Sequence, residues 1–118
     1  MERRLSRQET AQRYGVDQDF RGRALRCSSG AICDFRGVDV SQHGLGCVIV
    51  GDVQIRESLI IEFGGQKHSF EVMWVESYLG IENTYRVGLQ CLDHLLDVRG
   101  RLSGLGLVTA PLDEGYAA

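Results

Sequence analysis

The most constraining feature of this sequence is a series of six short apolar stretches separated by turn residues. Their length and their content of β-branched and aromatic residues are typical of strands, and they cover residues 20–27, 31–41, 45–50, 57–63, 67–77 and 84–92. Between them, Ser28-Ser29-Gly30 and Gly64-Gly65 are typical of hairpin turns. Closing so small a sheet removes its exposed edges. The sequence therefore predicts an all-β protein built as a six-stranded antiparallel barrel.

The segments outside these strands predict two short helices. Residues 94–102 carry leucine and valine at helical spacing, which indicates a C-terminal helix. Ser6 followed by Glu9 fits a capping box, so a helix is also expected over residues 7–14, ended by Gly15. The predicted organisation is a flexible, arginine-rich N-terminal arm at 1–19, a barrel with its C-terminal helix at 20–104, and a tail at 105–118.

Two of the expected strands carry further detail. In residues 67–77, apolar and polar side chains alternate, which places Phe70, Val72 and Trp74 on one face. In residues 84–92, Gly88 interrupts an otherwise regular strand. A glycine there predicts a β-bulge or a close approach of another group to the backbone.

The composition predicts a cytoplasmic protein without membrane insertion. No apolar run approaches the roughly 20 residues that a membrane-spanning helix needs, and no apolar segment follows the basic start as in a signal peptide. The cysteines are then expected to be reduced. Their spacing matches no zinc pattern, so buried apolar thiols are expected at Cys27, Cys33, Cys47 and Cys91.

Basic residues are concentrated near the N-terminus. Residues 1–26 hold seven of the chain's arginines, and Lys67 is its one lysine. Arginine suits forked contacts with phosphate and stacking on flat rings. The segment is either a solvated arm or part of an anion site.

A D-x-S-x-x-G motif ends the second expected strand, at Asp39, Ser41 and Gly44. In a purely structural interpretation, Asp and Ser hydrogen-bond to nearby backbone and Gly supplies the positive φ of a turn. In a functional one, the carboxylate accepts hydrogen bonds from a guanine edge, while arginine, hydroxyl and backbone N–H groups bind phosphate. Together with the arginines, the motif suits a ligand that contains both guanine and phosphate.

The sequence favours binding over catalysis, and we expect no enzyme activity. His43 lies near Asp39, Ser41 and Cys47, but no nucleophile motif surrounds Ser41. The chain also contains no Walker loop, and its three scattered histidines predict no metal site.

These residues resemble the PilZ domain family, the bacterial receptors for cyclic di-GMP. That family has an R-x-x-x-R motif in an N-terminal arm, then D/N-x-S-x-x-G at a strand end, on a six-stranded barrel with a C-terminal helix. Here "ERRLSR" at 2–7 matches the first motif through Arg3 and Arg7, and "DVSQHG" at 39–44 matches the second. "FEVMWVES" and "YRVGLQCLD" look like later strands of the family, so the resemblance covers about residues 2–102.

The resemblance implies a cyclic di-GMP site without any other cofactor. Its residues are Arg3, Arg4, Arg7, Asp39, Ser41 and Gly44. Arg3 and Arg7 are implied to clamp guanines and phosphates, Asp39 to read a guanine edge, and Ser41 and Gly44 to hold the ligand close to the backbone. In an alternative register, suggested by the long gap between Arg7 and Asp39, the second arginine is Arg13 and Glu9 replaces the first.

Two functions follow from the resemblance. The first is a single-domain receptor that changes conformation on binding cyclic di-GMP and signals to an unidentified protein effector in motility, surface attachment or exopolysaccharide control. The alternative is a degenerate PilZ-like module that binds a protein and not the nucleotide. DNA or other nucleic acid is a less favoured partner, because the chain outside the arm is acidic and offers few aromatic platforms.

Overall fold

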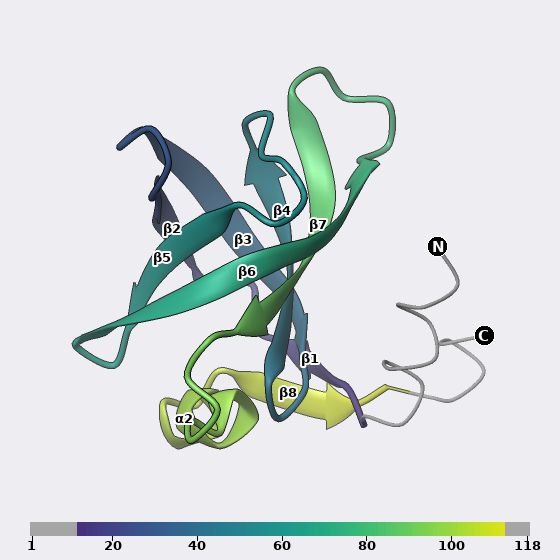
Figure 1. The fold of residues 1–118 in the computed structure, drawn as a ribbon. Coiled ribbons are helices and arrows are strands. Elements are labelled where there is room, and N and C mark those ends of the chain that lie inside the picture. Colours follow the sequence, from purple (N-terminus) through teal and green to yellow (C-terminus); the bar gives the residue numbers. More distant parts are fainter. Residues whose placement is uncertain (1–11, 113–118) are drawn as a thin grey trace.

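The computed structural model describes residues 12–112, which form eight strands and one helix (Figure 1). The elements are β1 (Tyr14–Val16), β2 (Arg21–Arg26), β3 (Ile32–Val40), β4 (Gly44–Val50), β5 (Ser58–Phe63), β6 (Gln66–Ser77), β7 (Thr84–Cys91), α2 (Val98–Gly104) and β8 (Val108–Pro111). Six of these strands coincide within a few residues with the six stretches predicted from the sequence.

Strands β2 to β7 close into an antiparallel barrel. Their order is β2-β5-β6-β7-β4-β3, and β2 also pairs with β3, which joins the two ends of the sheet. Every pairing in the barrel is antiparallel. The predicted six-stranded barrel is therefore confirmed.

Strands β1 and β8 lie in the segments expected to be arm and tail. One edge of β3 pairs with β2, but only Ile32–Arg36 of β3 take part, opposite Arg21–Leu25 of β2. The rest of this edge of β3 is therefore free to pair with another strand. There Tyr14 pairs with Val40 and Gly15 with Asp39, and β8 pairs with the other side of β1. Unpaired backbone groups of β3 thus order residues that carry no strand pattern of their own.

The helix expected over residues 7–14 does not extend to its predicted end. Tyr14 begins β1, and Gln12 and Arg13 are not helical. The rest of that range, and the expected flexibility of the arm, fall outside the described residues.

The C-terminal helix begins later than the leucine spacing indicated. The Asp97 carboxylate caps α2 by accepting from the Gly100 N–H at 2.9 Å. Val98 and Leu102 are fully buried, and α2 lies at one end of the barrel (Figure 1). Residues before Asp97 form a loop in which Leu95 is 95% exposed, because the Asp93 carboxylate accepts from the Leu95 N–H and fixes a turn.

The barrel interior is a single apolar core that includes four phenylalanines. Phe20 contacts Phe35 and Phe63 edge-to-face, with ring centroids 5.3 and 5.7 Å apart, and Phe70 lies 6.5 Å from Phe63. Leu45, Ile49, Leu59, Ile61, Val72 and Val87 are fully buried around them. Burial of this kind is the dominant stabilising contribution in so small a barrel.

A bulge in β6 overturns the simple alternation predicted for that strand. Val72 pairs with Leu89 and Trp74 with Gly88, so Met73 is an extra residue on β6. Phe70 and Val72 point into the core as expected, but Val75 packs against the core in place of Trp74. The bulge therefore places Trp74 on the outside of the barrel, over Gly88.

Three of the four cysteines are buried, and all four are free thiols. Burial raises the pKa of Cys47, which is fully enclosed, and also those of Cys33 and Cys91. The expectation of a buried thiol is wrong for Cys27, which is exposed just after β2.

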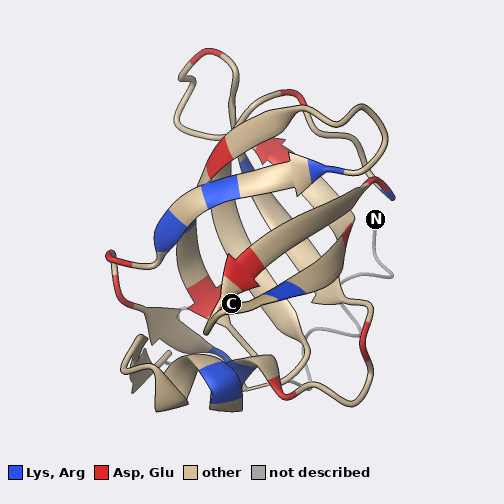
Figure 2. Ribbon diagram, turned by 90° about the vertical axis from the view of Figure 1, so that its left-hand side faces the viewer, with Lys and Arg blue, Asp and Glu red and all other residues tan. Residues whose placement is uncertain are grey.

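Charged residues of both signs are scattered along the barrel strands and loops (Figure 2). In Figure 2, acidic and basic segments are interspersed over the face in view and form no broad patch of one sign. Within residues 12–112, no helix is long and apolar enough to cross a bilayer.

We predict that His68 makes the fold less stable in mild acid. Its ring packs against Phe63 at 4.3 Å between centroids, and its Nε2 atom is buried without a hydrogen-bond partner among the described residues. Burial, and then the nearby Arg101 guanidinium, lower the pKa of His68 below 6.5. Below pH 6.5 the unfolded state therefore binds more protons than the folded state, and stability falls as the pH is lowered through this window.

Urea denaturation of the wild type and His68→Phe between about pH 7 and pH 5 tests this prediction. The variant keeps the ring and removes the titration, so its stability should depend less on pH. Parallel pH profiles for the two proteins would show that His68 contributes nothing to the loss.

Candidate functional site

The site is centred on Asp39, near the end of β3. A bulge between Gly37 and Asp39 shifts the register of β3 against β4. Val40 then points into the core, while the Asp39 carboxylate lies on the outside of the barrel over Gly46. Packing by its neighbours leaves the Asp39 side chain only 9% exposed.

Two arginines bind the Asp39 carboxylate, one on each oxygen. Arg13 Nη2 donates to Asp39 Oδ1 at 2.8 Å, and Arg86 Nη2 donates to Asp39 Oδ2 at 3.2 Å. Arg13 reaches the site from just before β1, and Arg86 from β7. A carboxylate this well buried needs such partners, because an unpaired buried charge is strongly unfavourable.

Ser41 and Gly44 form a tight turn directly beyond Asp39. Ser41 Oγ accepts from the Gly44 N–H at 3.1 Å, and the Ser41 N–H donates to the Gly44 carbonyl at 3.0 Å. A Cβ atom at Gly44 would lie 3.0 Å from Ser41 Oγ and 3.5 Å from Arg13 Nη1. The structural interpretation of the motif is therefore correct for Ser41 and wrong for Gly44, which has no positive φ. A side chain at Gly44 is disfavoured instead by the closeness of Ser41 Oγ and Arg13.

A row of cross-strand neighbours runs from Asp39 to Trp74 across four strands. Asp39 pairs with Gly46, Gly46 with Gly88, and Gly88 with Trp74. A Cβ atom at Gly46 would overlap Asp39 Oδ1, and one at Gly88 would overlap the Trp74 indole. The two glycines thus form a shallow trough in which larger side chains lie flat against the sheet.

Arg86 lies over this trough. Its Cζ atom is 5.5 Å from the centroid of the Trp74 ring, a cation–π distance, and its Nη1 donates to the Val87 carbonyl at 3.3 Å. The Arg86 side chain is 19% exposed. Arg86 is therefore held by a ring, a carbonyl and a carboxylate, with one part still open to solvent.

The structure brings some of the predicted residues together. Asp39, Ser41, Gly44 and Arg13 are contiguous, whereas Arg3, Arg4 and Arg7 lie outside the described residues. Sequence reasoning missed Arg86. One signal could have found it: Arg86 and Gly88 are two residues apart on one strand, so they share the outer face.

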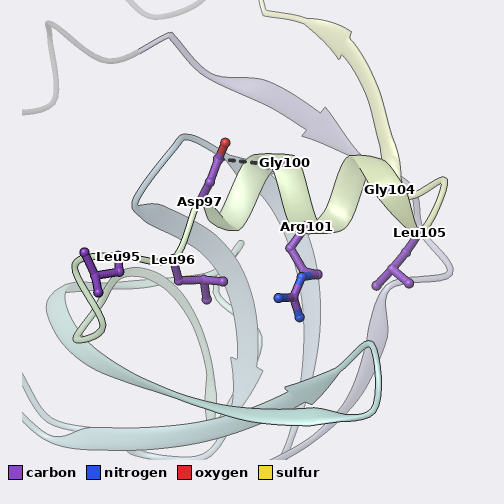
Figure 3. A pocket seen from close by; sticks show the side chains of 7 residues that line it. All are labelled: Leu95, Leu96, Asp97, Gly100, Arg101, Gly104 and Leu105. Carbon is purple, nitrogen blue, oxygen red and sulfur yellow. Dashed lines mark hydrogen bonds between the residues drawn. The ribbon is translucent and has the colours of Figure 1, made fainter.

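A separate hollow of about 530 Å³ lies beside α2. Figure 3 shows Leu95 and Leu96 at one end, Leu105 at the other, and the Arg101 side chain between them. Arg101 Nη1 donates to Gln66 Oε1 at 2.7 Å. None of the residues in contact with Asp39 lines this hollow, so it is not part of the site.

The arginines of the site belong to the residue type that binds phosphate best. Two guanidiniums, each partly exposed, lie on the two oxygens of the Asp39 carboxylate, and Arg13 also lies against the Ser41–Gly44 turn. His43 is exposed, and no residue of the cluster has the arrangement of an activated nucleophile.

The sequence matches no protein-family profile, and neither a curated protein nor a solved structure is significantly similar to the chain.

Gly88→Ala should destabilise the domain by about 1–3 kcal/mol, the usual effect of overpacking. The added methyl group would overlap the Trp74 indole and displace it from the trough. Urea denaturation followed by tryptophan fluorescence reports both the stability and the position of Trp74. In Gly22→Ala the new Cβ would lie 3.6 Å from Phe35 Cε1, an ordinary contact, so this control should change stability by less than about 0.5 kcal/mol. Equal effects of the two substitutions would contradict the trough.

Proposed function

We propose that this domain is a PilZ-type receptor that binds cyclic di-GMP, changes conformation and signals to a partner protein. The observation that best supports this is the 2.8 Å contact between Arg13 and Asp39, 26 residues apart in sequence. It joins an arginine of the N-terminal segment to the D-x-S-x-x-G turn, the two parts that the resemblance combines in one ligand site.

The chemistry of the ligand matches these groups. Cyclic di-GMP presents two phosphodiesters and two guanines. Arginine forks bind phosphate oxygens and also the O6 and N7 atoms of guanine. The Ser41–Gly44 turn allows the ligand to approach the backbone. We propose that Arg3, Arg4 and Arg7 add to Arg13 from the segment that precedes it.

A second candidate function is a protein-interaction module that needs no nucleotide. Asp39 already has a guanidinium on each oxygen, so its charge is compensated in the absence of ligand. In this second function the role of the cluster is structural: it holds β1 and the Ser41–Gly44 turn in place. The two functions differ in whether the cluster rearranges when cyclic di-GMP is added.

Isothermal titration calorimetry with cyclic di-GMP, combined with amide chemical shifts, tests the proposal. We expect a dissociation constant in the micromolar range or below, equivalent to about −8 kcal/mol or tighter. The shifts should concentrate on Arg13, Asp39, Ser41 and Gly44. Cyclic di-AMP is the matched control, because it keeps the phosphates and changes the base edges. Absence of heat and of shifts up to millimolar ligand would leave the interaction module as the function.

A further inference from the structure

The geometry points to Arg86 as a second anion-binding arginine, with Asp39 as the residue that positions it beside Arg13. In this arrangement the two guanidiniums bind one phosphate group together, and Asp39 acts through them without reading a base. The inference rests on the proposed function only for the identity of the ligand, since the site itself would take any accessible phosphate-bearing anion.

The Asp39 carboxylate holds both guanidiniums. Its carboxylate is nine-tenths buried and accepts from Arg13 on Oδ1 and from Arg86 on Oδ2. The two guanidiniums are therefore held on the two oxygens of one carboxylate, although Arg13 comes from before β1 and Arg86 comes from β7. Each guanidinium has five N–H donors, and Asp39 takes one from each.

Both arginines are accessible to a ligand from solvent. The side chains of Arg13 and Arg86 are 26% and 19% exposed, so both remain in contact with solvent while Asp39 does not. The three residues together carry one net positive charge, and Glu76, which is exposed, lies opposite Arg86 on β6. An anion that enters between the guanidiniums would meet the solvent-exposed parts of both arginines.

The Arg86 side chain is held in place by its neighbours. Its guanidinium lies over the Trp74 ring and donates to the Val87 carbonyl, so the side chain is ordered before any ligand arrives. A Cβ atom at Gly46 would come within 2.8 Å of Arg86 Nη1, which shows how closely the guanidinium lies on the sheet. An ordered side chain loses little rotamer entropy on binding, which favours affinity.

The role of Asp39 can be distinguished by base discrimination. If Asp39 reads guanine, its loss should reduce the preference for cyclic di-GMP over cyclic di-AMP. If Asp39 positions the arginines, its loss should change the affinities for both nucleotides and for inorganic pyrophosphate by a similar factor. Asp39→Asn is the appropriate change, because it removes the charge that holds the guanidiniums and keeps the size of the side chain.

The experiment compares four proteins: the wild type, Arg86→Met, Asp39→Asn and the control Arg36→Met. Arg36 is another half-buried arginine of the barrel, and its contact is with the Tyr78 hydroxyl at 3.4 Å. Cyclic di-GMP, cyclic di-AMP and inorganic pyrophosphate are titrated into each protein at one salt concentration. Arg86→Met should weaken all three probes by about 10- to 100-fold, the effect of losing one charged hydrogen-bonding group. Arg36→Met should bind as the wild type does.

Several results would overturn the inference. One is that Arg86→Met and Arg36→Met bind the probes with equal affinity. Another is that the wild type binds none of the three probes. A third is that Asp39→Asn loses its preference for cyclic di-GMP over cyclic di-AMP and keeps its affinity for pyrophosphate. Should Arg86→Met fail to fold, Arg86→Lys keeps the charge but loses the fork, and it should still weaken binding about 10-fold.

The proposed function fails in a different way. A wild type that binds pyrophosphate and both cyclic dinucleotides without preferring cyclic di-GMP, and still depends on Arg86, would contradict that function and support the anion site.

Discussion

Arg13→Ala is expected to weaken cyclic di-GMP binding by about 2–3 kcal/mol, or roughly 30- to 150-fold. The substitution removes a charge-assisted donor at the position where the N-terminal segment meets the D-x-S-x-x-G turn. It also leaves Asp39 with Arg86 as its one remaining guanidinium partner among the described residues, so the carboxylate is less well held. Calorimetric titration of the variant against the wild type, at one salt concentration, measures the loss.

Arg7→Ala and Arg99→Ala make this prediction specific. Arg99 lies over the ring of Tyr14, with its Cζ atom 5.1 Å from the centroid, so it is an arginine near β1 that does not touch Asp39. Arg99→Ala should bind normally. A large loss for Arg7→Ala and a small one for Arg13→Ala would assign the arginine motif to Arg3 and Arg7. If Arg13 is the second arginine of the motif, Glu9→Arg should raise the affinity.

Glu57→Ala is expected to lower the free energy of unfolding by about 3 kcal/mol, because it leaves a partly buried arginine without its main counter-ion. The Glu57 side chain is only 4% exposed and accepts from Arg26 at 2.7 and 3.1 Å. It also accepts from the Gln54 N–H at 2.9 Å and from Ser28 Oγ at 3.2 Å. These contacts join the end of β2 to the loop before β5.

Glu71→Ala is the matched control for Glu57. Glu71 pairs with Arg56 at 3.4 Å, and the Arg56 side chain is 80% exposed, so this surface pair should contribute less than about 1 kcal/mol. Urea denaturation of both variants measures the difference. Similar losses would mean that burial of the Arg26–Glu57 pair has no special effect.

The same pair has a pH signature. Burial alone would raise the pKa of Glu57, but hydrogen bonds from Arg26 and from the Gln54 N–H outweigh burial and leave the pKa below its ordinary 4.5. The stabilisation is therefore present above pH 4.5 and is lost as the pH falls through the lower pKa of the folded state. Glu57→Gln should show a flatter acid limb in its stability profile.

Local patterns in the sequence determined most of the barrel. Strand-forming residues, hairpin glycines and turn dipeptides are short-range signals, so β2 to β7 could be located before any tertiary contact was known. The same holds for the turn at the end of β3: Ser41 and Gly44 lie three residues apart and hydrogen-bond to each other.

Only the tertiary structure decided the elements that depend on a distant partner. β1 and β8 have three and four residues, too few for a recognisable pattern, and they are strands because the end of β3 has backbone groups left to pair. The start of α2 was also misplaced, because the leucine spacing before Asp97 indicates burial that the folded loop does not provide for Leu95.

The composition of the site was decided in the same way. Arg86 is 47 residues from Asp39 in sequence, and Arg13 is 26 residues away. Their contacts exist because bulges in β3 and β6 place Asp39 and Trp74 in one row with Gly46 and Gly88. A one-residue shift of register moves a side chain to the opposite face of the sheet, and that shift is a property of the paired strands and not of either segment alone.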